Sequence, residues 1–205
     1  MAIHVRVPVS FAVEGIIDQA VVLKLFDASG VVSGTPYVCD GIGNLRQRLE
    51  GFNAGARHSP WFVLCDLDRH ECAPELRGRL FGTPQTEGME LSVAVRAGES
   101  WLMADRQSFA TFLGVGMKRI PREPEHVADP KHAVVELARE SSKRVIREGL
   151  VPSAAGGRRI GPAYTDEVIQ YVRRRWSPDR ARAASPSLAR AFESCEAFSR
   201  RGAWS

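Results

Sequence analysis

The stretch Trp61-Phe62-Val63-Leu64-Cys65-Asp66-Leu67-Asp68-Arg69-His70 decides the predicted fold. Its apolar run, with aromatic and β-branched members, predicts a strand buried on both faces. The run ends in two aspartates one residue apart, at the edge where open sheets of parallel strands bind their ligands. Two carboxylates this close repel each other unless a cation holds them, and hard oxygen ligands suit Mg²⁺ or Mn²⁺.

Hydrophobic patterning along the rest of the chain predicts alternating strands and helices. Strands are predicted over residues 3–13, 31–39, 61–67 and 89–95, and helices over residues 16–26, 45–52, 106–113, 131–148, 164–176 and 187–199. Pro36 favours an edge position for the second strand, and Asp105 is predicted to cap the helix that follows it. The alternation predicts an α/β fold, in which helices flank a mostly parallel sheet. We predict a catalytic α/β domain over residues 1–120 and a basic helical extension over residues 121–205 that packs on it.

The composition is typical of a soluble globular protein, with 44% apolar and 25% charged residues in a chain of 205. No apolar stretch approaches the roughly 20 residues that a membrane-spanning helix needs. Residues 1–11 lack the pattern of a cleavable signal. We therefore expect a cytoplasmic protein that does not associate with membranes. No two of its four cysteines are spaced as Cys-x-x-Cys, which disfavours a zinc site.

Charge is unevenly distributed along the chain. Residues 1–130 contain 13 basic and 16 acidic residues, a net charge of −3, whereas residues 131–205 contain 15 and 8, a net charge of +7. A basic part joined to an acidic part suits a polyanionic substrate. The run Arg173-Arg174-Arg175 is a candidate for phosphate contacts, although solvated helix faces explain such runs equally well.

Acidic residues stand at the predicted carboxyl ends of the strands. Glu14 follows the first strand, and Asp66 and Asp68 follow the third. Glu99 comes shortly after the fourth strand. Because right-handed crossovers between parallel strands place these ends along one edge of the sheet, we expect the four carboxylates to lie close together.

The order of these motifs resembles a known family. Val13-Glu14-Gly15 after the first strand and Asp66-Leu67-Asp68 after a later strand resemble the signature of Toprim domains. More closely, the chain resembles the Toprim-like proteins of the domain-of-unknown-function family DUF4276, which are related to the nuclease parts of overcoming-lysogenization-defect (OLD) proteins and other prokaryotic anti-phage systems. Four further stretches resemble family signatures: Gly98-Glu99-Ser100-Trp101-Leu102-Met103-Ala104-Asp105, Asp129-Pro130-Lys131, Gly161-Pro162-Ala163-Tyr164 and Ser185-Pro186-Ser187-Leu188.

The acidic residues also fit the chemistry of phosphodiester cleavage. Charge on the attacking and leaving oxygens can be stabilised by two divalent cations about 3.5–4 Å apart. Glu14, Asp66 and Asp68 would hold a first Mg²⁺ or Mn²⁺ ion, with Glu14 alternatively acting as general base. Glu99, together with Asp18 or Asp105, would hold a second ion.

The resemblance implies a metal-dependent endonuclease that acts on DNA or RNA, as an effector of an anti-phage defence system. Arg69 and His70 would lie within reach of the scissile phosphate, with His70 as a candidate catalytic residue. Such nucleases commonly work beside an ATPase of the ABC or AAA type. The chain contains no Walker A motif, so we expect that ATPase to be a separate protein. Self-association into a homo-oligomer is compatible with the sequence.

The same residues permit other interpretations. Asp66 and Asp68 could form a turn or a helix-capping pair, and Glu14 or Glu99 could be a solvated residue in the first turn of a helix. His70 could be an exposed loop residue. The protein would then be a non-catalytic module that binds nucleic acid or a partner on the same fold. Phosphotransferases of the haloacid-dehalogenase type also use Asp-x-Asp, but there the pair follows the first strand rather than the third.

Overall fold

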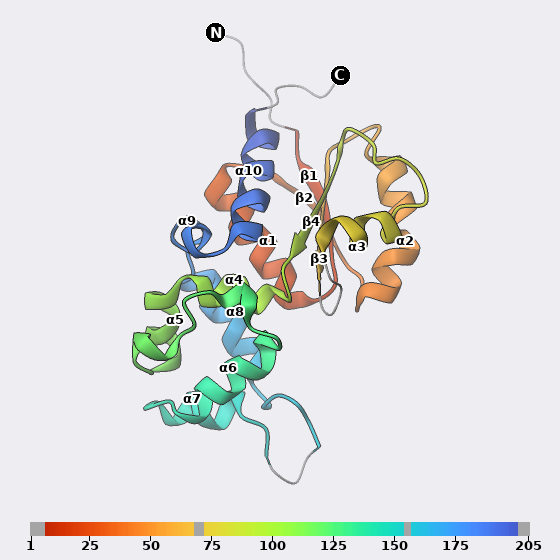
Figure 1. Cartoon of the computed structure of the whole chain (residues 1–205). Helices are drawn as coiled ribbons and strands as arrows, with labels where there is room; N and C mark the ends of the chain where they lie inside the picture. Colours follow the sequence, from red (N-terminus) through yellow and green to blue (C-terminus); the bar gives the residue numbers. More distant parts are fainter. Residues whose placement is uncertain (1–6, 68–71, 154–156, 201–205) are drawn as a thin grey trace.

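The computed structural model describes residues 7–67, 72–153 and 157–200 (Figure 1). At its centre, four parallel strands form one sheet in the order β2-β1-β3-β4. The strands are β1 Val9–Val13, β2 Ser33–Val38, β3 Trp61–Asp66 and β4 Met89–Ala94. The predicted α/β fold with a parallel sheet is confirmed, and β2 lies at an edge of the sheet.

Helices cover both faces of the sheet (Figure 1). They are α1 Ile16–Ser29, α2 Ile42–Gly55, α3 Ala73–Leu80, α4 Gly98–Ala104, α5 Arg106–Leu113, α6 Pro130–Arg139, α7 Arg144–Leu150, α8 Tyr164–Arg174, α9 Pro178–Ala181 and α10 Pro186–Arg200, with short 3₁₀ helices at Met117–Arg119, Pro124–His126 and Arg182–Ala184. Helix α1 packs on one face together with α10 and the helices that follow β4, whereas α2 and α3 pack on the other face. Within the described ranges, no helix is long and apolar enough to cross a membrane.

The central strand β3 buries side chains on both faces, as its apolar sequence predicts. Phe62 and Leu64 belong to the core that contains α1. Trp61 and Val63 belong to the core beneath α2 and α3. Because successive side chains point to opposite faces, a strand covered on both sides needs an unbroken apolar run. The last residue of the strand, Asp66, is only half-buried.

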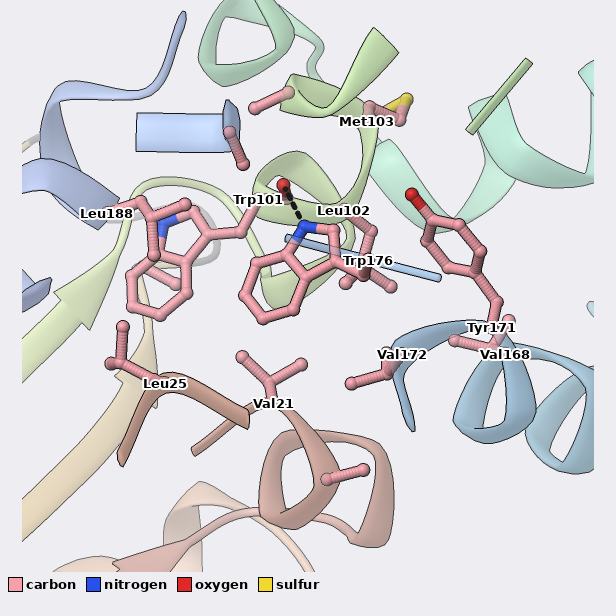
Figure 2. Packing of buried hydrophobic residues seen from close by; sticks show 14 of the residues in the cluster. Val21, Leu25, Trp101, Leu102, Met103, Val168, Tyr171, Val172, Trp176 and Leu188 are labelled. Atoms are coloured by element: carbon pink, nitrogen blue, oxygen red, sulfur yellow. Dashed lines mark hydrogen bonds between the residues drawn. The ribbon is translucent and has the colours of Figure 1, made fainter. Parts of the chain in front are cut away.

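Two tryptophans join the C-terminal helices to the rest of the fold (Figure 2). Trp101 of α4 and Trp176, which follows α8, are fully buried in the core that also contains Leu25 of α1. The indole N–H of Trp176 donates to the carbonyl oxygen of Trp101 at 3.1 Å. The indole N–H of Trp101 donates to Ser187 Oγ of α10 at 2.7 Å. Residues from both predicted parts of the chain therefore share one hydrophobic core.

The single helix predicted over residues 131–148 is wrong, because α6 and α7 divide this region. Ser141 and Ser142 lie at the break. Ser141 Oγ donates to the carbonyl oxygen of Leu113, and both the amide and the hydroxyl of Ser142 donate to the carbonyl oxygen of Gly114. These bonds satisfy carbonyl groups at the C-terminal end of α5, which lack helical partners. Serine side chains that bond to backbone in this way compete with helix continuation.

Candidate active site

The carboxyl ends of the strands bring four acidic side chains together. Glu14 directly follows β1, and Asp66 is the last residue of β3. Glu99 lies in the first turn of α4, the helix that follows β4. Asp18, in the first turn of α1, completes the group. We call these four residues the carboxylate cluster.

Backbone N–H groups orient two members of the carboxylate cluster. The amide of Asp66 donates to Glu14 Oε1 at 2.9 Å, and the amide of Gly98 donates to Asp66 Oδ1 at 3.0 Å. Glu14 is thereby tied to the end of β3, and Asp66 is tied to the start of α4. Hydrogen bonds to a charged acceptor are stronger than neutral ones, so these contacts hold the two side chains in defined orientations.

Asp18 reaches the same place from α1. Its Oδ2 accepts the N–H of Gly15 at 2.9 Å, which caps the first turn of the helix. Its Oδ1 lies 3.1 Å from the position that a β-carbon on Gly98 would occupy. The absence of a side chain at residue 98 therefore lets α4 begin close to Asp18.

Glu99 is the most buried member, with 4% of the residue exposed. The hydroxyl of Tyr164, at the start of α8, donates to Glu99 Oε1 at 3.1 Å. The ammonium of Lys131, in the first turn of α6, lies 3.6 Å from the same oxygen. A buried carboxylate is costly unless hydrogen bonds and an opposite charge compensate it. Tyr164 and Lys131 supply both to Glu99.

The charges of the carboxylate cluster perturb one another and Lys131. The pKa of Asp18 is raised to about 7, mainly by burial and then by the charges of Glu99 and Glu14. The pKa of Lys131 is also raised, chiefly by Glu99 and further by Asp66 and Asp18, while burial opposes the shift. Like charges that perturb each other in this way are typical of functional sites.

The donor set fits a hard cation. Carboxylate oxygens are the ligands that Mg²⁺ and Mn²⁺ prefer, and the charges of Glu99 and Glu14 add to burial in raising the pKa of Asp18. Among residues 7–67, 72–153 and 157–200, no group of three or more His, Cys, Asp or Glu side chains is arranged as a set of metal ligands. Asp68, a predicted ligand beside Asp66 and Glu14, lies outside the described residues. Metal binding therefore stays a prediction.

The remaining predicted site residues do not join the cluster in the described part of the chain. Arg69 and His70, like Asp68, fall outside it. The arginines at 173–175 are exposed at the C-terminal end of α8. Because α8 begins at Tyr164 and a helix rises about 1.5 Å per residue, they lie on the order of 15 Å from the Tyr164–Glu99 contact. The last two of them line a separate pocket of about 430 Å³.

Asp105, at the other end of α4, has a structural role. It is 3% exposed and occupies the predicted N-cap position of α5, but its side chain makes no capping hydrogen bond there. Its carboxylate instead accepts bonds from the guanidinium of Arg180 at 2.7 and 3.1 Å and from the amide of Ser177 at 3.1 Å. The acid therefore joins the end of α4 to α9.

Sequence patterns alone did not assign a role to Lys131 or Tyr164. Both stand in stretches that resemble family signatures, so the resemblance marked them without indicating their contacts. Tyr164 reaches Glu99 because Gly161 lets the preceding loop pack against α7. A β-carbon on Gly161 would overlap the carbonyl oxygen of Gly149 and would lie 2.5 Å from the carbonyl carbon of Leu150.

Comparison with known proteins does not identify the chain: no family model, no curated protein and no solved structure matches it. Membership of the Toprim-like family therefore remains a prediction from the motifs. The parallel sheet and the carboxylate cluster are the observations from which a function can be argued.

Proposed function

We propose that this protein is a metal-dependent nuclease that hydrolyses phosphodiester bonds in DNA or RNA with Mg²⁺ or Mn²⁺. The observation that carries the proposal is the convergence of Glu14, Asp18, Asp66 and Glu99 at the carboxyl edge of a parallel sheet. That edge is where open α/β sheets bind ligands. We further propose that the protein is a Toprim-like defence effector of the DUF4276 type that acts with a separate ATPase.

The carboxylates would hold the cations in two groups. Glu14 and Asp66 would ligate a first ion together with Asp68, and Glu99 and Asp18 would ligate a second. Divalent cations at these positions would supply Lewis-acid stabilisation of the charge that develops on phosphate oxygens. One or two ions are compatible with this set of acids.

Two side chains of the site have suitable properties for the remaining chemistry. As an alternative to ligating the second ion, Asp18, with a pKa raised to about 7, can accept a proton from an attacking water at its Oδ1, since its Oδ2 already accepts the N–H of Gly15. The ammonium of Lys131 is half-exposed although it contacts Glu99. It can therefore also stabilise negative charge on a bound phosphate.

A second candidate function is a non-catalytic module that binds nucleic acid or a partner. It is favoured by the contacts that the acids already make within the protein: Glu99 binds Lys131 and Tyr164, and Asp66 accepts a backbone N–H from Gly98. Such a module would bind without metal and would cleave nothing.

Cleavage assays separate the two functions. Purified protein is incubated with plasmid DNA, single-stranded DNA and RNA in Mg²⁺, in Mn²⁺ and in EDTA. For the nuclease we expect metal-dependent cleavage that falls at least about 100-fold in Asp66→Asn and Glu14→Gln. Glu193→Gln is the matched control, since Glu193 is exposed on α10. Cleavage that persists in a homogeneous Asp66→Asn preparation would reject the nuclease, and binding without any cleavage would favour the module.

A further inference from the structure

A small basic hollow adjoins the carboxylate cluster on one side of α6. Its volume is about 220 Å³. Four of the residues that line it carry permanent positive charges: Lys131, Arg139, Arg158 and Arg159. His132 is a fifth potential cation, and none of the described residues that line the hollow is acidic. We call this feature the basic hollow.

Helix geometry explains why these charges face one space. Lys131 and Arg139 are eight residues apart, with Val135 halfway between them, so all three lie on the same face of α6. Arg158 and Arg159, in the segment that precedes α8, also line the hollow. Two segments separated in sequence therefore place like charges around one opening.

Lys131 connects the basic hollow to the candidate active site. Its ammonium lies 3.6 Å from Glu99 Oε1, and the same side chain lines the hollow. A ligand in the hollow would therefore sit next to whatever the carboxylate cluster binds. This arrangement suits a nucleic-acid strand. Cations bound by the carboxylate cluster would hold the scissile phosphate, and the positive side chains of the basic hollow would hold the next phosphate of the strand.

Arg139 and Arg159 each form an ion pair within the protein, but both remain available to a ligand. Arg139 pairs with Glu136 at 2.9 Å, and Arg159 pairs with Asp129. All four of these side chains are at least 44% exposed. Exposed pairs of this kind contribute little stability, so a phosphate can replace the carboxylates at modest cost. Guanidinium groups bind phosphate through two parallel hydrogen bonds.

We infer that the basic hollow is a phosphate subsite, which binds a phosphate of the nucleic-acid strand beside the phosphodiester to be cleaved. The inference rests on the proposed nuclease function. The volume favours a small anionic group, because pockets for drug-sized ligands are typically about 300–1,000 Å³.

Binding without metal tests the subsite independently of cleavage. Fluorescence anisotropy measures the Kd for labelled DNA and RNA strands of about 16 nucleotides in EDTA. The measurement is repeated at NaCl concentrations from about 50 to about 200 mM, to obtain the salt dependence of Kd. We expect the double variant Arg139→Gln/Arg158→Gln to raise Kd by about tenfold or more. The slope of log Kd against log salt concentration should fall by about 0.7 for each phosphate that the variant no longer neutralises. The matched control is Arg190→Gln, an exposed arginine on α10, and it should bind as the wild type does.

Three outcomes would overturn the subsite: wild-type protein that binds no strand, a double variant that binds as tightly as the control, and a double variant that loses equal affinity for labelled polyglutamate. The last would assign the hollow to an acidic protein segment. Strands with and without a 5′-phosphate identify the source of the phosphate. Loss confined to the phosphorylated strand supports a terminal phosphate, and equal loss on both supports an internal one. Asp66→Asn should retain binding, so lost cleavage with retained binding separates the two proposals.

Discussion

Two buried carboxylates lie at opposite ends of α4 in contrasting surroundings. Glu99, in the first turn, shares its region with three other acids and has the Tyr164 hydroxyl at 3.1 Å and one ammonium at 3.6 Å. Asp105, just beyond the last turn, has a guanidinium at 2.7 Å and a backbone N–H of its own. The two residues are 4% and 3% exposed, so burial does not distinguish them. The two acids differ in the charges that surround them.

This difference indicates which acid stabilises the fold and which one can bind a ligand. A carboxylate that meets a guanidinium and an N–H is compensated within the protein, and breaking that arrangement costs stability. Glu99 instead lies near Glu14, Asp18 and Asp66, and a cation can relieve like charges held this close together. We therefore expect substitutions at the two ends of α4 to affect different properties.

The largest effect is expected for Gly161→Ala, which removes the loop packing that brings Tyr164 to Glu99. The added methyl group would overlap the Gly149 carbonyl oxygen, so we expect the free energy of unfolding to fall by about 3 kcal/mol. Urea denaturation measures it. Gly116→Ala is the control, since nothing lies within 4 Å of a β-carbon there. A loss at residue 161 no greater than at residue 116 would contradict this account of the loop.

Magnesium should stabilise the protein through the carboxylate cluster and not through Asp105. At a Mg²⁺ concentration about 100 times Kd, ligand binding adds about 2.7 kcal/mol to the free energy of unfolding. We expect Glu99→Gln to lose most of this increment and Asp105→Asn to retain it, as measured by thermal melting at pH 8 with and without the ion. An unchanged Tm of the wild type in both Mg²⁺ and Mn²⁺ would count against the cation site.

Without metal, the order of the two variants should reverse. Asp105→Asn loses charge-assisted bonds to Arg180 and Ser177, so we expect a loss of about 2 kcal/mol. Glu99→Gln retains an acceptor for Tyr164 and removes one of four repelling charges, so we expect a change below about 1 kcal/mol. Urea denaturation in EDTA compares the two directly. Equal losses would mean that Glu99 is as structural as Asp105.

Taken per pH unit, the smallest predicted effect is a pH dependence from Asp18. Its pKa is raised from 3.8 to about 7 in the folded protein, so the folded state binds the proton more tightly than the unfolded state. Its contribution to stability is therefore full below about pH 4 and is lost as the pH rises to about 7. One such group changes stability by no more than about 1.4 kcal/mol per pH unit.

Asp18→Asn should remove this component, so that stability between pH 5 and 7, a window of about two units within the shift, declines less in the variant than in the wild type. Asp27→Asn is the matched control, because Asp27 is an exposed acid on the same helix. Parallel stability curves for wild type and Asp18→Asn, measured by urea denaturation at each pH, would disprove the raised pKa.

Much of the fold could be predicted because its signals are local. The unbroken apolar run of β3 requires cover on both faces, and Pro36 is best tolerated in an edge strand. The break between α6 and α7 could not be predicted, since Ser141 and Ser142 bond to carbonyl groups at the end of α5. Those acceptors lie far away in sequence, and the apolar spacing across the break still resembles one helix.

By itself, the sequence determined that acids would stand at the carboxyl ends of parallel strands. A buried strand ends where its apolar run stops, and the run of β3 stops at Asp66. Only the tertiary structure decided what compensates those acids. Lys131 and Tyr164 reach Glu99 from helices 32 and 65 residues further along the chain, and Arg180 reaches Asp105 from 75 residues away. Such pairings depend on how helices pack across the shared core, which no local pattern of residues encodes.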